Sequence, residues 1–366
     1  MKNPEDALIS LIRITIGKKS NFNTALSAAD WYNLYRLAHK QAILGILFAG
    51  IERLSSMQLP PQDILYKWMV VTSAIEDRNE QLNEECVAVQ KLFIEAGLKT
   101  TILKGQGLSP YYGSLARFRT SGDIDVWVDG DWKTISDFVC TISPNRAFDM
   151  KHTHLCLFQD TIVEVHWWPS VSTNPIVNHR LKRFYREHIQ SQCCNEVVLP
   201  DGRRIFATDP FFDSIHILIH LFDHFLYEGI GLRQVMDYYF VIIHPAVQSR
   251  KKEITKIYNE FGLYKFSRAV MWVMSVVFEL DSKQMLTEPD HISGKYLWDE
   301  IISGGNFGQY APENYVYKEL WFHRMLRRTR RKIRLWRYNP IGVICSPIYK
   351  LYLSIWKHMV ILKYNL

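Results

Sequence analysis

Apolar and polar positions in the first 97 residues follow the three- and four-residue spacing of amphipathic helices. The spacing is clearest over residues 27–54, which read SAADWYNLYRLAHKQAILGILFAGIERL, where Ser27 or Asp30 is placed to cap the helix start. A second helical run extends from about Pro61 to Gly97, and Gly97 stands where a helix commonly ends on glycine. We therefore predict a helical N-terminal region over residues 1–97.

Between residues 98 and 170 the pattern changes to short segments rich in β-branched or alternating apolar residues. Strands are predicted in LKTTILKG and DIDVWV, with a short helix or turn between them in GQGLSPYYGS. A helix over about residues 132–142 follows. The segments FDMKHTHLCLF and TIVEVHWW then flank Gln159–Asp160, which predicts a hairpin. These residues form the predicted α/β core, 98–170.

After Pro169 the helical spacing returns. The segment FFDSIHILIHLFDHFLYEGIGLRQVMDYYFVII predicts two helices joined near residues 228–231, and further helix is expected over about 251–280. We assign residues 171–320 to a helical C-terminal domain and residues 321–366 to a basic and apolar tail. The fold class predicted is α+β, with a small mixed β-sheet between helical N-terminal and C-terminal regions.

The charge of the chain is uneven. Its net charge is +7, yet the segment 321–366 contains 11 Lys/Arg and no Asp/Glu, which leaves 33 basic and 37 acidic residues in the rest. A tail of this kind suits an anionic partner such as RNA, DNA, an acidic lipid surface or an acidic protein. A basic helix is expected over 323–337, followed by an apolar segment for a membrane interface or for packing on the body.

The cysteines and the N-terminus bear on location. None of the 6 cysteines forms a CxxC pair, so neither a disulfide framework nor a zinc site is indicated, and a reducing compartment fits. The N-terminus has early acidic residues and lacks the features of a signal peptide. A cytoplasmic location is expected, with peripheral membrane association as the alternative that the tail suggests.

Two carboxylates stand out in the predicted strand DIDVWV. Asp123 and Asp125 are separated by one residue, so both side chains point to the same face of the strand. Carboxylates this close repel each other unless a cation lies between them, and Mg²⁺ prefers such oxygen ligands. Glu164, in the later strand IVEVHW, is the candidate for a third ligand. A DxD sequence alone is short, and an isolated copy usually marks a solvated strand end.

The order of these elements resembles a known superfamily. The segment LKGQGLSPYYGSLARFRTSGDIDVWV, followed by VEVHW, is similar to the uncharacterised nucleotidyltransferases of the DNA polymerase beta superfamily. The resemblance is strong over about residues 95–168 and looser beyond them. It implies a nucleotidyltransferase core within the α+β fold, and a turn that reads Leu-Lys-Gly where the superfamily has Gly-Ser.

The resemblance also implies roles for particular residues. Asp123 and Asp125 would bind two Mg²⁺ ions, and Glu164 would complete the metal site and help to activate the acceptor hydroxyl. Backbone amides near Gly105 would hold the triphosphate of an NTP, and Lys104 or Arg119 would neutralise phosphate charge.

Each of these basic residues also has a plain structural interpretation. Lys104 is equally placed to extend from a strand end into solvent, and Arg119 to pair with an acid of the sheet. Gly113–Ser114 offers a second match to the Gly-Ser turn. The strand before it would contain Pro110, which is unsuited to a central strand, so the Lys104–Gly105 turn is preferred.

Arg233 is a further candidate for nucleotide binding, because the helix that carries it flanks the nucleotide site in the resembling family. It also stands four residues before Asp237, the spacing of an ordinary helix salt bridge. The loop at 304–308, GGNFG, is either a turn between helices or a close approach to a ligand, with Phe307 stacking on a base.

Histidines recur near the same elements. His154 and His166 lie on the predicted hairpin, and His166 shares the face of Glu164. His216, His220 and His224 recur every four residues on one helix face, which favours packing against the cleft over metal binding.

Two hypotheses follow. The first is a metal-dependent nucleotidyltransferase that transfers NMP from an NTP to an acceptor that the sequence does not identify. The second is a catalytically inactive protein of the same fold that binds nucleic acid or an acidic membrane surface through residues 321–366.

Overall fold

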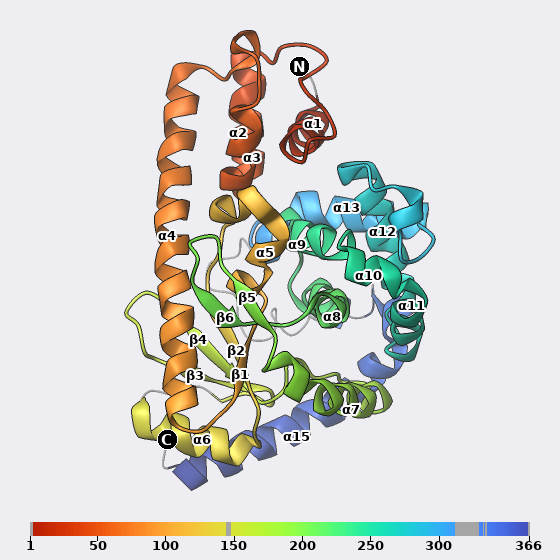
Figure 1. Ribbon diagram of the computed structural model, residues 1–366. Coiled ribbons are helices and arrows are strands. Elements are labelled where there is room, and N and C mark those ends of the chain that lie inside the picture. The colour runs from red at the N-terminus through yellow and green to blue at the C-terminus, as the bar shows by residue number, and fades with distance from the viewer. Residues whose placement is uncertain (1–2, 144–147, 312–328, 332, 334, 365–366) are drawn as a thin grey trace.

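The structure is a computed structural model that describes residues 3–143, 148–311, 329–331, 333 and 335–364. A helical bundle lies at one end and a small β-sheet at the other, and one long helix runs alongside both (Figure 1). The fold is α+β, as predicted. Most of the basic helix expected over 323–337 lies outside the described residues.

The N-terminal region forms four helices, as its hydrophobic spacing predicts: α1 (Pro4–Thr15), α2 (Ala28–Lys40), α3 (Leu44–Ile51) and α4 (Gln62–Glu95). Ser27 caps α2, because its side chain accepts a hydrogen bond from the Asp30 amide while the Asp30 side chain accepts one in return. The chain leaves α4 through Gly97, which has a φ of 77°.

Helix α4 joins the two ends of the molecule because its apolar residues are buried in two different places. Near its start, Ile64 and Trp68 belong to the core of the helical bundle. Near its end, Val89 and Phe93 belong to the core beneath the sheet. At 34 residues it is long enough to span both.

The main sheet of the described residues has four strands in the order β1-β2-β4-β3, namely β1 (Thr100–Leu103), β2 (Ile124–Val128), β4 (Val163–His166) and β3 (His152–Leu155). Strand β2 is antiparallel to β1 and parallel to β4, while β3 and β4 are antiparallel. The predicted hairpin is therefore confirmed. Helix α6 (Trp132–Ile142) connects β2 to the hairpin, and Asp131 caps its start.

The two faces of this sheet have different surroundings. Ile124, Val126 and Val165 point into one core, with α4 and α6. Because side chains alternate along a strand, Asp125 and Glu164 point to the opposite face, which is covered by α8 (Pro210–Tyr227) (Figure 1). The functional candidates therefore lie between the sheet and the C-terminal helices.

A second, two-stranded sheet lies in the region that the sequence assigned to helices. Strands β5 (Glu196–Val198) and β6 (Arg204–Phe206) flank a turn with Gly202 at a φ of 85°. The Gln90 side chain accepts from the Phe206 amide and donates to its carbonyl, which fixes β6 against α4. Such short strands have too few positions for a clear period in the sequence.

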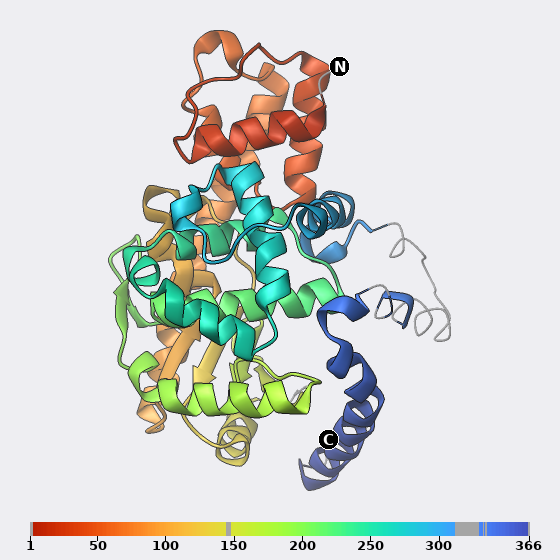
Figure 2. The same cartoon turned by 90° about the vertical axis from the view of Figure 1, so that its right-hand side faces the viewer.

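Further α-helices of the described residues are α5 (Ser109–Tyr112), α7 (Pro175–Gln192), α9 (Leu232–Ile242), α10 (Pro245–Ser249), α11 (Lys251–Glu260), α12 (Tyr264–Phe278), α13 (His291–Gly304) and α15 (Pro340–Tyr364). Helices α8 and α9 meet at residues 228–231, where the sequence places the junction. Helix α15 runs along the outer edge of the molecule, below α7 in Figure 1 and separate from the helical bundle in Figure 2.

Candidate active site

The two central strands of the sheet bring an aspartate and a glutamate side by side. Asp125 of β2 is paired in register with Glu164 of β4, so both side chains project from the same face at neighbouring positions. On either side of this pair, Leu103 of β1 is opposite Asp125, and His154 of β3 is opposite Glu164. The proximity of Glu164 to the DxD pair depends on this parallel register.

Asp125 is 3% exposed, and both of its carboxylate oxygens have partners. Its Oδ2 lies 3.0 Å from the Lys104 ammonium, and its Oδ1 lies 2.9 Å from Nε2 of His166. Burial alone would raise the pKa of Asp125, but these two partners lower it well below its ordinary value. Asp125 is therefore a carboxylate throughout the physiological pH range.

Glu164 lies among three histidines. Its Oε2 is 3.3 Å from His166 Nε2 and 3.4 Å from His152 Nδ1, and its Oε1 is 3.8 Å from His154 Nε2. Burial would raise the pKa of Glu164, but the hydrogen bond from His166, together with the charges of His166 and His152, outweighs burial and lowers the pKa to about 2. Ligand atoms of Asp125, Glu164 and His166 lie within 4.8 Å of one another, as do those of His152, His154 and Glu164.

The turn after β1 directs Lys104 toward these acids. Lys104 and Gly105 both have positive φ angles, 41° and 49°. A lysine in this conformation is strained by about 1–3 kcal/mol, and such strain is typical of functional turns. Burial lowers the pKa of the Lys104 ammonium, but Asp125, Asp123 and Glu164 together raise it above its ordinary value. The ammonium is therefore a permanent cation among three carboxylates.

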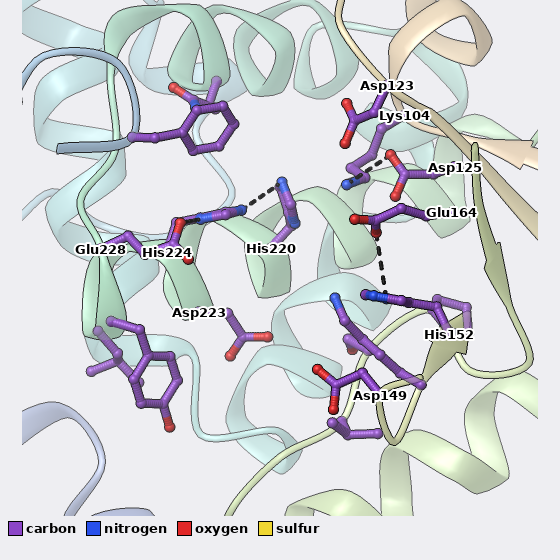
Figure 3. A pocket seen from close by; sticks show the side chains of 18 of the residues that line it. Lys104, Asp123, Asp125, Asp149, His152, Glu164, His220, Asp223, His224 and Glu228 are labelled. Atoms are coloured by element: carbon purple, nitrogen blue, oxygen red, sulfur yellow. Dashed lines mark hydrogen bonds and ion pairs between the residues drawn. The ribbon is translucent and has the colours of Figure 1, made fainter. Parts of the chain in front are cut away.

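Asp123 immediately precedes β2 and is more exposed than Asp125. The negative charge of Asp125 is the main cause that raises the pKa of Asp123. Figure 3 shows Asp123 beside Lys104 at the edge of the same cavity. This repulsion between the two aspartates is what a bound divalent cation would relieve.

Arg119 is held in a buried ion pair. Its Nε and Nη2 donate to the two carboxylate oxygens of Asp237 on α9, at 2.7 and 2.8 Å, and its Nη1 donates to Ser121 Oγ at 2.7 Å. The Tyr112 hydroxyl donates to the same carboxylate at 2.5 Å. Arg119 thus pairs with an acid of a helix, rather than of the sheet.

Arg233 has no such partner in the described residues. Its Nη1 donates to the carbonyl of Thr120 at 3.0 Å, and its buried Nε has no hydrogen-bond acceptor there. The helix salt bridge with Asp237 is replaced by the pair between Asp237 and Arg119. Its guanidinium lies over the Phe307 ring, 5.2 Å from the ring centre. Arg233 also lines the cavity, so its guanidinium is a candidate for binding an anionic ligand there.

The glycine-rich loop at 304–308 holds Phe307 beside the cavity. A Cβ atom at Gly308 would lie 2.2 Å from the carbonyl oxygen of Glu228, and one at Gly229 would lie 2.8 Å from the Gly308 Cα. The two loops therefore contact each other backbone to backbone, which only glycine permits. Phe307 has a φ of 51°, and its ring centre is 4.8 Å from that of His224.

Helix α8 supplies the opposite wall of the cavity (Figure 3). Glu228 Oε2 lies 2.7 Å from His224 Nδ1, and His224 Nε2 lies 3.1 Å from His220 Nε2. Burial and the Lys104 ammonium lower the pKa of His220 well below its ordinary value, and a proton that reaches His220 has a path through His224 toward Glu228. Asp223 also faces the cavity, and burial raises its pKa to about 7.

Most of these groups line one cavity of about 640 Å³, and the sequence candidates His154 and His166 do not. The candidate residues from the sequence that border it are Lys104, Gly105, Arg119, Asp123, Asp125, Glu164 and Arg233. His220, His224 and Phe307 also line it, while His216 is buried behind them. A cavity of this size is large enough for a nucleotide-sized ligand.

Sequence reasoning missed several further groups of this cavity, among them Asp149, His152 and Asp223. For His152 there was a signal, since it alternates with His154 on the same strand and so shares its face. For Asp223 the only signal was its helical spacing from His220. Nothing local in the sequence places Asp149 near the site.

A family of uncharacterised nucleotidyltransferases matches residues 27–279, more than two thirds of the chain, and this protein belongs to that family. The matched segment includes the acidic pair of strands, the Lys104–Gly105 turn and the wall formed by α8. No curated protein matches the chain. Membership in the family supports nucleotidyltransferase activity in general, with an NTP as substrate and a second molecule as acceptor.

Proposed function

We propose that this protein is a metal-dependent nucleotidyltransferase that transfers NMP from an NTP to an acceptor and releases pyrophosphate. The observation that carries the proposal is the pairing of Asp125 with Glu164 on neighbouring parallel strands, both facing a cavity of about 640 Å³. Two carboxylates at this spacing, with Asp123 at the cavity edge, suit the in-line transfer of a phosphoryl group between two divalent cations.

The donor set fits two Mg²⁺ ions held by Asp123, Asp125 and Glu164. These side chains offer hard oxygen ligands, and an oxygen of Asp125 and one of Glu164 are close enough to share one ion. The Lys104 ammonium lies 3.0 Å from Asp125, and this ion pair supports the binding of positive charge among these acids. When bound, the ions would supply the positive charge that the triphosphate and its transfer require.

The triphosphate is expected along the turn after β1 and toward α9. Backbone amides at Gly105 and the Lys104 ammonium lie at one side of the cavity, and Arg233 lies at another with an unpaired Nε. Arg119 contributes less directly, because its donors are already bonded to Asp237 and Ser121. Phe307 stands beside Arg233, where a base would stack on its ring.

The transfer also needs a group that takes the proton of the acceptor. The acceptor oxygen forms a bond to the α-phosphorus, the bond to pyrophosphate breaks, and the proton leaves the acceptor. The family resemblance assigns this step to Glu164, but the low pKa of the Glu164 carboxyl group makes it a weak base. His220 on the facing wall is a second candidate: burial lowers its pKa well below its ordinary value, but its contact with His224, which is hydrogen-bonded to Glu228, gives the proton a path away from the acceptor.

The proposal is tested by transfer of labelled NMP, and release of pyrophosphate, over a panel of NTPs and acceptors with and without Mg²⁺. The double variant Asp123→Ala/Asp125→Ala should lose Mg²⁺-dependent NTP binding and transfer. Asp160→Ala, in the exposed loop between β3 and β4, is the matched control and should retain both. The proposal fails if the wild type shows no Mg²⁺-dependent NTP binding, or if the double variant matches it.

A second pair of variants distinguishes the role of His220 from that of Glu164. His220→Gln should lower kcat and shift the pH profile of transfer while NTP affinity stays near that of the wild type. Glu164→Gln should instead weaken Mg²⁺-dependent NTP binding itself, because it removes a ligand charge. Equal NTP affinity in Glu164→Gln and the wild type would remove Glu164 from the metal site.

A further inference from the structure

Helix α15 has an exposed apolar stripe along its length. The exposed residues are Ile341, Ile344, Ile348, Leu351, Tyr352, Ile355 and Met359. Their spacing of three and four residues places them on one face of the helix. Scattered apolar residues on a surface are ordinary, but a continuous stripe of seven is typical of an interaction surface.

The opposite face of α15 is already bound to the body of the protein. Trp356 and Val360 are buried in the core beneath the sheet. The Trp356 ring lies 5.8 Å from that of Trp132 and 6.4 Å from that of Trp167. The helix is therefore fixed with its stripe turned away from the core, along the outer edge of the molecule (Figures 1 and 2).

The charge of the surrounding segment indicates what covers the stripe. Residues 321–366 contain 11 Lys/Arg and no Asp/Glu. Two lysines of α15 itself face the body of the protein, since Lys350 lines the cavity and Lys357 lies 3.9 Å from Asp149. Apposition of two such segments in a dimer would bring uncompensated positive charges together. A nucleic acid would bind the charges and leave the aliphatic stripe in water. An anionic bilayer satisfies both, since it offers a negative surface and an apolar interior.

We propose that α15 docks this protein onto an anionic lipid bilayer, with its apolar stripe in the interface and the net positive charge of residues 321–366 attracting the anionic surface. Within the described residues, no helix is long and apolar enough to cross a membrane, so α15 would lie along the surface. Tyr349 and Leu353, on the inner side of α15, line the candidate active-site cavity. Docking therefore brings that cavity beside the bilayer, whether or not the protein transfers nucleotides.

Flotation of the full chain with vesicles tests the proposal. The vesicles are phosphatidylcholine alone, and phosphatidylcholine mixed with phosphatidylglycerol. The wild type should bind the anionic vesicles, bind neutral ones less well, and be released progressively by salt. Ile348→Glu, at a side chain that is 73% exposed, should lower partition into anionic vesicles by roughly tenfold or more, because it places a charge in the apolar interface.

The matched control is Ile292→Glu on α13, whose side chain is 75% exposed and lies outside the stripe. It should bind vesicles as the wild type does. Leu351→Glu is a second stripe variant in case the first is unstable, and unchanged thermal unfolding verifies that each variant is folded. Equal binding by the stripe variants and the control overturns the proposal.

Two further outcomes also overturn it. One is a wild type that binds no anionic vesicles. The other is a wild type that is dimeric by light scattering and becomes monomeric in Ile348→Glu, because a second copy would then cover the stripe. RNA binding that persists in Ile348→Glu while vesicle binding is lost supports the lipid surface as the partner of the stripe.

Discussion

The buried pair between Arg119 and Asp237 offers a sharp test of how this site is built. Arg119→Met removes a guanidinium that makes two hydrogen bonds to one carboxylate and a third to Ser121. The side chains of Arg119 and Asp237 are 6% and 8% exposed, so water cannot replace the lost partner freely. Asp237 would keep the hydrogen bond from Tyr112 alone.

The expected loss of stability is large. Removing one partner of a buried ion pair usually costs about 3–5 kcal/mol, because the other charge stays buried without compensation. A free energy of unfolding of about 5–15 kcal/mol is ordinary for a protein, so Arg119→Met should still fold in the absence of denaturant. Asp237→Asn should lower the free energy of unfolding somewhat less, because the amide oxygen of the new side chain can still accept the hydrogen bond from the Tyr112 hydroxyl.

The measurement is equilibrium unfolding in urea, compared across wild type, Arg119→Met, Asp237→Asn and the double variant. The double variant should lose less than the sum of the two single losses, by about 1–3 kcal/mol, since the unpaired charge is then absent. If Arg119→Met lowers the free energy of unfolding by less than about 1 kcal/mol, with an unchanged dependence on urea concentration, the structural role of the Arg119–Asp237 pair is refuted. A simultaneous large loss of NTP affinity in that folded variant would then assign Arg119 to phosphate binding.

Three other predictions concern the cavity and its supports. Burial raises the pKa of Asp223 to about 7, so ionisation of this side chain increasingly opposes folding as the pH rises from about 4 to 7. Asp223→Asn removes this effect. In urea unfolding it should raise the free energy of unfolding by about 1–3 kcal/mol at pH 8 and leave it unchanged at pH 4. The exposed Asp160→Asn should show no such dependence, and an equal effect of the two variants would contradict the prediction. Gly308→Ala should lower the free energy of unfolding, measured by thermal unfolding, by about 2 kcal/mol or more, because its Cβ would lie 2.2 Å from a carbonyl oxygen. The control Gly113→Ala places its Cβ where no atom lies within 4 Å, so it should lower the free energy of unfolding by only about 1 kcal/mol. Lys104→Met should tighten Mn²⁺ binding measured by electron paramagnetic resonance in the absence of nucleotide, because the ammonium no longer competes for the carboxylate; weaker binding would contradict this.

Much of the fold could be predicted because its signals are local. The long α4 has many turns over which the helical period repeats, and the cap formed by Ser27 and Asp30 is a matter of adjacent residues. The strands β5 and β6 have three residues each, too short for a period to be visible. Their pairing also depends on contacts with α4, far away in the sequence.

The candidate site divides in the same way. The common face of Asp123 and Asp125 follows from the two-residue period of a strand. The neighbouring position of Glu164 does not, because it requires β4 to pair in parallel with β2 and in a particular register. A shift of one residue would have turned Glu164 to the apolar core.

The sequence by itself therefore determined most of the helices, the strands of the main sheet, the DxD pair, the basic tail and the resemblance to nucleotidyltransferases, because each of these is carried by short contiguous segments. Only the tertiary structure decided that Lys104 pairs with Asp125, that Asp237 takes Arg119 rather than Arg233, and that the inner face of α15 borders the cavity. The physical reason is that hydrogen bonds and ion pairs act over a few ångströms in space. Arg119 lies 118 positions before Asp237 and still binds its carboxylate, because the folded chain brings the two side chains together.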